Sequence, residues 1–201
     1  MINGRRSPRR TGRLIQAFAF TAVLALGASA CSSDGGSTDT SSTTVAPDAK
    51  KALAALNAGL TAHAAGDLVT ASADYNKALK YDATNQFAFY NLALIDESDG
   101  NYGLAEDKYR SALKTDPAYE PALFNLAILR TGPDPAEAIT LYESAVAADK
   151  KDAAAWLNLG LLLRANGKER AGDKDVLRAI ALDSSLKDPA QAAGAATPTT
   201  P

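Results

Sequence analysis

The chain has 201 residues, of which 46% are hydrophobic and 22% are charged, and its formal net charge is −2. A single cysteine excludes a framework of internal disulfides, and one cysteine with one histidine leaves too few ligands for a zinc site. The length allows one domain with extensions at its ends.

Residues 1–30 have the parts of a secretory signal peptide. Five arginines and no acidic residue form its basic start: Arg5, Arg6, Arg9, Arg10 and Arg13. The largely apolar run that follows, residues 14–26, is short for a membrane span. Removal of residues 1–30 leaves 16 basic against 23 acidic side chains, a net charge of −7. Such a chain is a poor candidate for binding nucleic acid, which needs a basic face.

Cys31 directly follows the small residues Ala28, Ser29 and Ala30. This arrangement resembles the lipobox of bacterial lipoproteins, in which the cysteine is lipidated and becomes the mature N-terminus. The resemblance implies a lipid anchor on Cys31 and a place on the extracytoplasmic side of the cell membrane. Ala28 stands where the family has leucine, so secretion without an anchor is the alternative. The paired arginines leave twin-arginine export open as a route.

Two segments have the composition of unfolded chain. Nine of the 16 residues in 32–47 are Ser or Thr, too polar to bury a core, so residues 31–47 are predicted to be a flexible tether that starts at the lipidated cysteine. Its hydroxyls could carry O-linked sugars or serve only as a solvated spacer. Residues 187–201 are rich in Ala, Thr and Pro and are predicted to be a disordered tail.

Residues 48–186 carry one pattern four times. Its reference alanines are Ala78, Ala112, Ala145 and Ala179, separated by 34, 33 and 34 residues. A fixed period of this length indicates a helical solenoid. The repeats are predicted at about 52–85, 86–119, 120–152 and 153–186. The eight antiparallel helices of this all-α fold are predicted at 49–64, 68–81, 86–98, 102–115, 119–130, 135–148, 153–165 and 168–182.

The second helix of each repeat shows a small residue, an aromatic residue and another small residue at positions i, i+4 and i+7. These positions share one helical face, where small residues let another helix approach closely. The fourth repeat departs from the pattern with Gly172 and Val176, so weaker packing is expected there. The third repeat is one residue short in the turn 131–135.

At two places the repeat resembles the tetratricopeptide repeat family. Trp156-x2-Leu159-Gly160 matches the family's W-x2-L-G opening, and Asp116-Pro117 matches its closing turn. The resemblance covers about two thirds of the chain. It implies a right-handed helical solenoid of about four tetratricopeptide repeats, a fold that binds many unrelated partners.

The resemblance also implies that a partner binds in a concave groove lined by the first helix of each repeat. The groove residues would be Leu53, Leu56, Leu60, Phe87, Tyr90, Leu94, Phe124, Ile128, Leu157 and Leu161. His63, Glu97 and Arg164 would lie nearer its rim. This apolar surface fits an extended or helical peptide with apolar side chains. The alternative for each residue is burial between helices.

One asparagine recurs in the first helix of each repeat: Asn57, Asn91, Asn125 and Asn158. An amide side chain both donates and accepts, so it can pair with a peptide unit of a bound chain. The row resembles the asparagine ladder of O-linked N-acetylglucosamine transferase. The alternative is that each asparagine bonds the neighbouring helix.

No catalytic, cofactor or metal residues are assigned. The boundary aspartates, such as Asp82 and Asp116, are one repeat apart and are explained by turn chemistry. His63 has no partner for catalysis that the sequence identifies. The leading hypothesis is a non-enzymatic, membrane-anchored, extracytoplasmic scaffold that binds a protein or peptide partner and needs no cofactor. The alternative is a structural subunit of an envelope assembly, secretion or pilus complex, and the oligomeric state is open.

Overall fold

The computed structural model describes residues 47–189. The predicted signal peptide, the predicted lipidation at Cys31 and almost all of the predicted tether therefore lie outside the described residues, as do residues 190–201 of the predicted tail.

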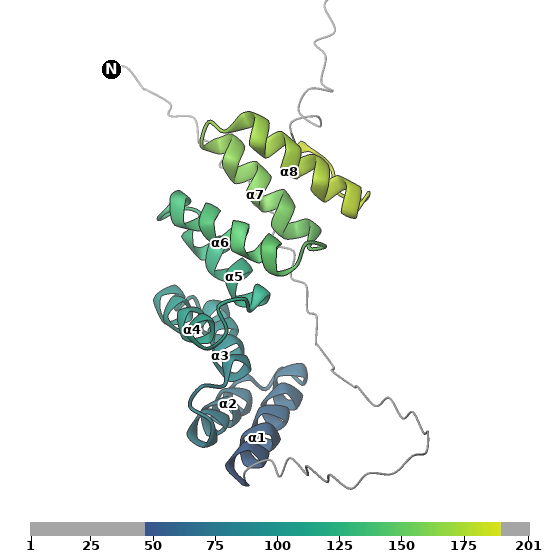
Figure 1. The fold of residues 1–201 in the computed structure, drawn as a ribbon. Helices are drawn as coiled ribbons and strands as arrows, with labels where there is room; N and C mark the ends of the chain where they lie inside the picture. The colour runs from purple at the N-terminus through teal and green to yellow at the C-terminus, as the bar shows by residue number, and fades with distance from the viewer. Residues whose placement is uncertain (1–46, 190–201) are drawn as a thin grey trace, which may run out of the picture. The chain divides into compact units, whose positions relative to one another are not determined.

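Residues 47–189 form eight α-helices and no strand (Figure 1). The helices are α1 (Pro47–Ala64), α2 (Leu68–Tyr81), α3 (Gln86–Ser98), α4 (Tyr102–Thr115), α5 (Glu120–Arg130), α6 (Pro135–Ala148), α7 (Ala153–Ala165) and α8 (Glu169–Leu182). The all-α prediction is confirmed, and only the starts of α1, α5 and α8 differ from the predicted bounds. In α5, for example, Tyr119 is the N-cap and not the first helical residue. None of the eight helices has the combination of length and apolar character that a membrane crossing requires.

Glycines with positive φ close three of the four turns within repeats: Gly66 (80°), Gly100 (78°) and Gly167 (76°). In the first of these turns the Asp67 N–H donates to the Ala62 carbonyl, five residues earlier, at 2.9 Å. The third repeat closes its turn differently, because the Asp134 N–H donates to the Arg130 carbonyl, only four residues earlier, at 2.8 Å. Asp134 then caps α6 by accepting from the Glu137 N–H at 3.0 Å. The missing residue is thus absorbed in the turn, and α6 keeps its register.

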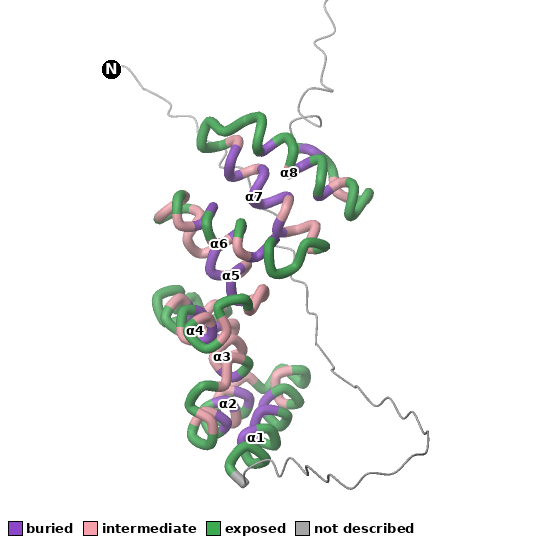
Figure 2. Tube along the Cα trace, in the orientation of Figure 1, coloured by how far each residue is buried: buried purple, intermediate pink, exposed green. Residues whose placement is uncertain are grey.

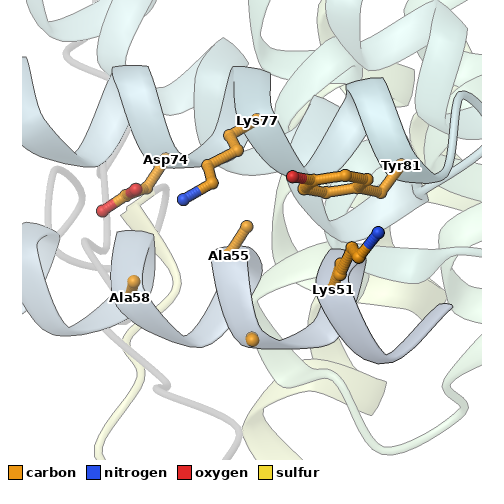
Figure 3. Close-up of a pocket in the computed structure, with 7 residues that line it drawn as sticks. Lys51, Ala55, Ala58, Asp74, Lys77 and Tyr81 are labelled. Atoms are coloured by element: carbon orange, nitrogen blue, oxygen red, sulfur yellow. The ribbon is translucent and has the colours of Figure 1, made fainter. Parts of the chain in front are cut away.

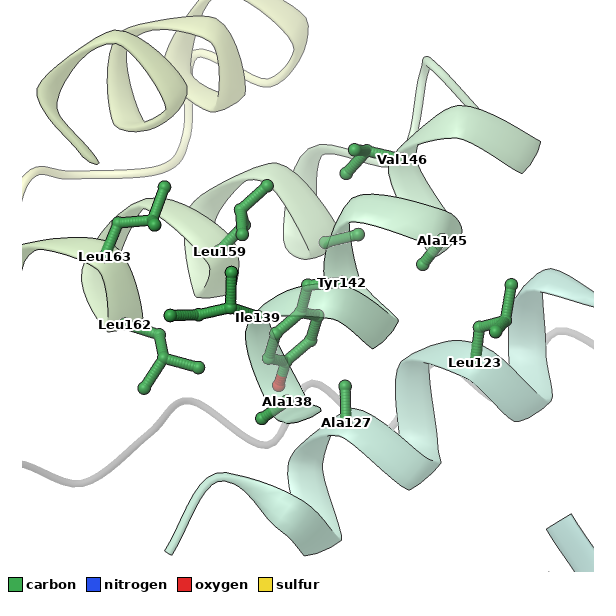
Figure 4. Close-up of a cluster of buried hydrophobic side chains, with 11 residues drawn as sticks. Leu123, Ala127, Ala138, Ile139, Tyr142, Ala145, Val146, Leu159, Leu162 and Leu163 are labelled. Atoms are coloured by element: carbon green, nitrogen blue, oxygen red, sulfur yellow. The ribbon is translucent and has the colours of Figure 1, made fainter. Parts of the chain in front are cut away.

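The helices pack as four pairs, α1 with α2 through α7 with α8, and each pair contacts the next (Figure 1). The small residues and tyrosines of three second helices are at most 1% exposed: Ala71, Tyr75, Ala78, Ala105, Tyr109, Ala112, Ala138, Tyr142 and Ala145. Buried residues follow the contacts between helices along the chain (Figure 2). In the largest cluster, side chains from α5, α6 and α7 surround the ring of Tyr142 (Figure 4). The predicted packing face is therefore confirmed.

The chain beyond α8 remains attached to the last pair. Leu186 packs against the cluster that contains Leu157 and Val176. Asp188 is 7% exposed and accepts hydrogen bonds from both terminal nitrogens of Arg164, at 2.7 and 3.0 Å. Residues 183–189 therefore cover part of the C-terminal end of the described repeats.

Two facing glycines, Gly160 of α7 and Gly172 of α8, let the last two helices approach closely. A Cβ on Gly160 would lie 2.7 Å from the Gly172 carbonyl oxygen and 2.8 Å from Val176 Cγ2. Val176 is completely buried in this contact. The expectation of weaker packing is corrected here, because the absence of two side chains brings the backbones together.

Gly172→Ala is expected to lower the free energy of unfolding by about 1–3 kcal/mol, because its methyl group would overlap the Gly160 carbonyl. Urea unfolding followed by circular dichroism measures the change. Gly103→Ala in α4 is the matched control, because nothing lies within 4 Å of its added Cβ. That control should gain up to about 1 kcal/mol from helix propensity. A Gly172→Ala protein as stable as the control would contradict this account.

Candidate binding surface

The predicted groove residues fall into three environments in the structure. Leu53, Leu60 and Phe87 are exposed, by 57%, 41% and 45%. The half-buried members are Tyr90, Leu94, Phe124, Ile128 and Leu161. Leu56 and Leu157 are only 6% and 3% exposed and belong to core clusters. Those two residues therefore act in helix packing, and the accessible apolar side chains of the set lie mainly on α1 and α3.

The four asparagines of the predicted row have four different environments. Asn57 is exposed, whereas Asn158 is 4% exposed. Asn91 donates to the Phe87 carbonyl of its own helix at 2.7 Å. Asn125 donates to the Tyr90 hydroxyl of the preceding repeat at 3.2 Å. Asn91 and Asn125 thus donate within the protein and Asn158 lies within hydrogen-bonding reach of Tyr142, so the row does not present four free amides to a partner.

The residues predicted at the groove rim meet the tyrosines of the second helices. His63 Nδ1 lies 3.3 Å from the Tyr75 hydroxyl, and Tyr109 donates to Glu97 Oε2 at 2.8 Å. Burial raises the pKa of Tyr75 to about 12 and lowers the pKa of His63. The hydroxyls of buried tyrosines therefore tie the two helices of the first and second repeats together.

The third repeat lacks this tie. Thr131 stands at the corresponding position, one residue closer in sequence, and donates to the Ala127 carbonyl at 2.8 Å. The Tyr142 hydroxyl is buried and makes no well-aligned hydrogen bond to residues 47–189, although Thr131 and Asn158 lie near enough to lower its pKa against the effect of burial. In the fourth repeat Val176 replaces the tyrosine, and Arg164 pairs instead with Asp173, at 2.7 Å, and with Asp188.

A chain of aromatic contacts crosses from α3 to the start of α5. The rings of Phe87 and Tyr119 meet edge to face with centroids 5.6 Å apart. Tyr119 meets Tyr90 in the same way at 5.4 Å, and Tyr90 lies 5.9 Å from Tyr109. Burial raises the pKa of Tyr90 to about 12, and the charges of Glu120 and Glu97 add to this shift.

The Glu120 carboxyl adjoins these rings, and Asp152 lies near Glu120. Glu120 is the first residue of α5, and Asp152 caps α7 by accepting from the Ala154 and Ala155 N–H groups. Glu120 Oε1 is buried and makes no well-aligned hydrogen bond within residues 47–189, although the Glu120 carboxyl lies within hydrogen-bonding reach of Asp152. Burial, followed by the effects of Asp152 and Asp149, raises the pKa of Glu120 to about 8. The surroundings of Glu120 therefore favour its protonated form.

Tyr119, Glu120 and Asp152 are not among the site residues predicted from the sequence. Tyr119 stands where the other repeats carry the capping residues Asn85 and Asp152, and it makes no side-chain cap hydrogen bond. An aromatic residue at a position where other repeats have a capping residue could have indicated this site from the sequence.

A shallow pocket of about 320 Å³ lies between α1 and α2 (Figure 3). Its lining residues are Lys51, Ala54, Ala55, Ala58, Asp74, Lys77 and Tyr81. By register Ala54 and Ala58 correspond to Ala88 and Leu92, which are buried in the cluster that joins the first and second repeats. The pocket therefore exists because no earlier repeat within the described residues packs on α1.

Solved structures share the fold. The crystal structure of MamA is 20% identical to this chain, covers 67% of it and 79% of MamA, and has a TM-score of 0.59. PilF of Pseudomonas aeruginosa is 21% identical, over 69% of this chain and 64% of PilF, with a TM-score of 0.60. A tetratricopeptide repeat protein of Parabacteroides merdae ATCC 43184 is 20% identical, over 68% and 55%, with a TM-score of 0.60. No protein-family model matches the chain, and no curated protein matches it significantly.

The eight stacked helices and these likenesses define the fold as a right-handed helical solenoid of about four tetratricopeptide repeats. The fold predicted from the sequence is thereby confirmed.

Replacing two equivalent tyrosines by phenylalanine removes the hydroxyl and keeps the ring, so the effect of the hydrogen bond can be measured separately from the packing of the ring. Tyr109→Phe is expected to lower the free energy of unfolding by about 1–3 kcal/mol, because it leaves Glu97 without its hydroxyl donor. Tyr142→Phe should cost less than this, because the buried hydroxyl that it removes has poorly aligned contacts with Thr131 and Asn158 in place of a well-formed hydrogen bond. Urea denaturation of both variants measures the difference. Equal losses of unfolding free energy in the two variants would contradict these hydrogen-bond assignments.

Glu120 also predicts a pH dependence of stability. Its pKa in the folded protein, about 8, lies above the ordinary value of 4.5, so the folded state binds more protons between these values. Its contribution to stability therefore falls as pH rises through that window. Glu120→Gln should gain stability relative to the wild type between pH 5 and pH 8.5, as measured by urea midpoints.

Glu143→Gln, at an exposed position on α6, controls for the loss of one negative charge. The Glu143→Gln and wild-type proteins should lose stability in parallel over this range. Parallel behaviour of Glu120→Gln and the wild type would show that Glu120 has no raised pKa.

Proposed function

We propose that this protein is a non-enzymatic scaffold that is anchored to the membrane outside the cytoplasm and binds a protein or peptide on the first-helix face of its repeats. The exposure of large apolar side chains on this face carries the proposal. Leu53 and Leu60 are seven residues apart on one face of α1, and Phe87 holds the position of Leu53 in the next repeat. Exposed apolar side chains that gather on one face are typical of interaction sites.

The membrane anchor is the second part of the proposal. The basic and apolar residues of 1–30, followed by Ala28-Ser29-Ala30 and Cys31, support export and lipidation. The Ser- and Thr-rich residues after Cys31 support a tether that holds the repeats away from the membrane. A net charge of −7 without residues 1–30 favours repulsion from anionic lipid over adsorption.

A second set of exposed apolar residues favours the alternative, a permanent subunit of an envelope, secretion or pilus assembly. Val69, Tyr102 and Leu104 lie at the starts of α2 and α4 and are 84%, 60% and 53% exposed. In a permanent assembly, partner subunits would cover this set of residues as well as the first-helix face. Light scattering after size exclusion distinguishes the two functions, because the subunit would be purified with its partner.

A cross-linked pull-down from envelope extract tests partner binding. The bait is the full chain, and a parallel bait carries Leu53→Ser and Phe87→Ser, two exposed positions whose change should preserve the fold. The partner is expected to be lost from the parallel bait. Leu177→Ser is the matched control, because Leu177 is 60% exposed on α8. Retention of the partner by the double variant and its loss from the control would move the binding site away from the first helices.

Cys31→Ala tests the anchor. The variant is expected to leave the membrane fraction, since the thiol that would carry the lipid is removed. Cell fractionation with metabolic labelling by a fatty-acid analogue measures both effects. A variant that stays in the membrane fraction, or a wild-type protein that takes up no label, would contradict the proposed lipid anchor at Cys31.

A further inference from the structure

The outward side of α8 carries three cations in a row. Arg170, Lys174 and Arg178 are four residues apart, so they share one side of the helix, and all three are exposed. Neighbouring members of this α8 basic row are about 6 Å apart along the helix axis. At the nine corresponding positions of the other second helices only one residue is basic. These positions hold Val69, Ala73 and Lys77 in α2, Gly103, Asp107 and Ser111 in α4, and Ala136, Thr140 and Ser144 in α6.

The acids of α8 do not neutralise this row. Asp173 pairs with Arg164 of α7 at 2.7 Å, and Glu169 lies four residues before Asp173 and so on the same side of α8. Asp175 is half-buried. The ion pairs within residues 47–189 include no member of the α8 basic row. Like charges four residues apart destabilise a helix slightly, and here no ion pair within the described residues offsets that cost.

Trp156 of α7 extends the basic surface beyond α8. The Arg178 guanidinium lies over the Trp156 ring, 5.7 Å from its centroid. The indole N–H of Trp156 donates to the Lys150 carbonyl at 3.1 Å. Trp156 therefore joins one end of the α8 basic row to the turn between α6 and α7, where the side chains of Lys150 and Lys151 are exposed.

Charge is divided unequally along the repeats. Residues 47–149 hold 8 basic and 15 acidic side chains, a net charge of −7. Residues 150–189 hold 8 basic and 6 acidic side chains, a net charge of +2. The last repeat is thus the part of an otherwise acidic chain that attracts an anion.

Charge complementarity indicates an acidic occupant, and the distribution of charge favours a short one. An anionic membrane is an extended surface, so it would also meet the acidic side chains of the first three repeats, which it repels. A peptide segment can contact α8 alone. Its carboxylates can accept paired N–H groups from Arg170 and Arg178 and a single hydrogen bond from the Lys174 ammonium.

We propose that the α8 basic row binds an acidic segment of a protein partner. This surface is separate from the first-helix face of α1 and α3, so it adds a second contact to the proposed scaffold. Ion pairs between exposed groups contribute more to the rate and selectivity of association than to affinity, and salt weakens them. The contact at α8 therefore selects partners by charge, whereas the first-helix face selects them by apolar fit.

The test begins with random 12-residue peptides displayed on phage and selected on the purified full chain. The selected pool is divided between the wild type and a row variant, which carries Arg170→Glu, Lys174→Glu and Arg178→Glu. Peptides that the wild type retains and the row variant loses are expected to be rich in Asp and Glu. Circular dichroism checks that the row variant keeps the helix content of the wild type.

A matched control variant carries Lys50→Glu, Lys80→Glu and Lys114→Glu. These lysines are exposed on α1, α2 and α4 and belong to no ion pair of residues 47–189. The control makes the same change of net charge as the row variant, but scatters it over three helices. It should retain the acidic peptides.

The strongest acidic peptide is then synthesised with its acids or with the matching amides, Asn and Gln. The amide peptide is expected to bind the wild type at least about tenfold more weakly, and the row variant should lose the acidic peptide to the same extent. Raising the salt concentration from about 50 to about 500 mM should weaken the acidic peptide at least about fivefold and leave the amide peptide unchanged.

Acidic peptides that bind the row variant as well as the wild type, or that the control variant also loses, would overturn this inference. A correctly folded wild type that selects no acidic peptide would do the same. Each of these outcomes leaves the proposed first-helix binding in place, because Leu53→Ser and Phe87→Ser test that face separately.

Two further measurements identify other occupants. Cys31→Ala protein, which lacks the proposed anchor, is pelleted with vesicles of equal parts phosphatidylglycerol and phosphatidylcholine. Pelleting that the row substitutions abolish would make lipid the occupant and overturn the peptide inference. Light scattering at low salt measures self-association, and self-association that the row substitutions abolish would make a second copy the occupant, with the same consequence.

Discussion

The structure depends on the close contact between paired helices that small residues allow and buried tyrosines fill. Ala71, Tyr75 and Ala78 make this contact in the first repeat, and the same positions make it in the second and third. Alanine brings the backbones together, and the tyrosine ring occupies the space that remains between the helices. Because each pair is held at this fixed spacing and contacts the next pair, the first helices present their outward positions at regular intervals.

The repeated backbone carries side chains that are not repeated. The position at the end of each first helix holds His63, Glu97, Thr131 and Arg164 in turn, and each has a different partner. The accessible apolar side chains of the first-helix face lie mainly on α1 and α3, while the carboxyl groups of Glu120 and Asp152 come together at the starts of α5 and α7. The scaffold is regular, but the chemistry that could recognise a partner is local.

The sequence predicted the helices almost to the residue, because a pattern repeated four times averages out the ambiguity of any one segment. The capping aspartates and the turn glycines fixed most of the helix ends. The sequence could not separate exposed from buried members of the predicted groove, because both are apolar and share one periodicity. Leu53 and Leu56 illustrate this, since they are three residues apart in α1 and are 57% and 6% exposed. The carboxyl pair was hidden because Glu120 and Asp152 meet only when two repeats stack.

The two ends of the described repeats are unequal. At the first end the pocket beside α1 exposes alanines that later repeats bury, and no chain within residues 47–189 covers them. At the other end Leu186 and the buried Asp188–Arg164 pair hold the chain against α7. Stacked repeats lose structure from an end inward, since an end has only one neighbour. Within residues 47–189, unfolding from the ends is therefore expected to start at α1, because a bidentate ion pair must be broken before α7 is released at the other end.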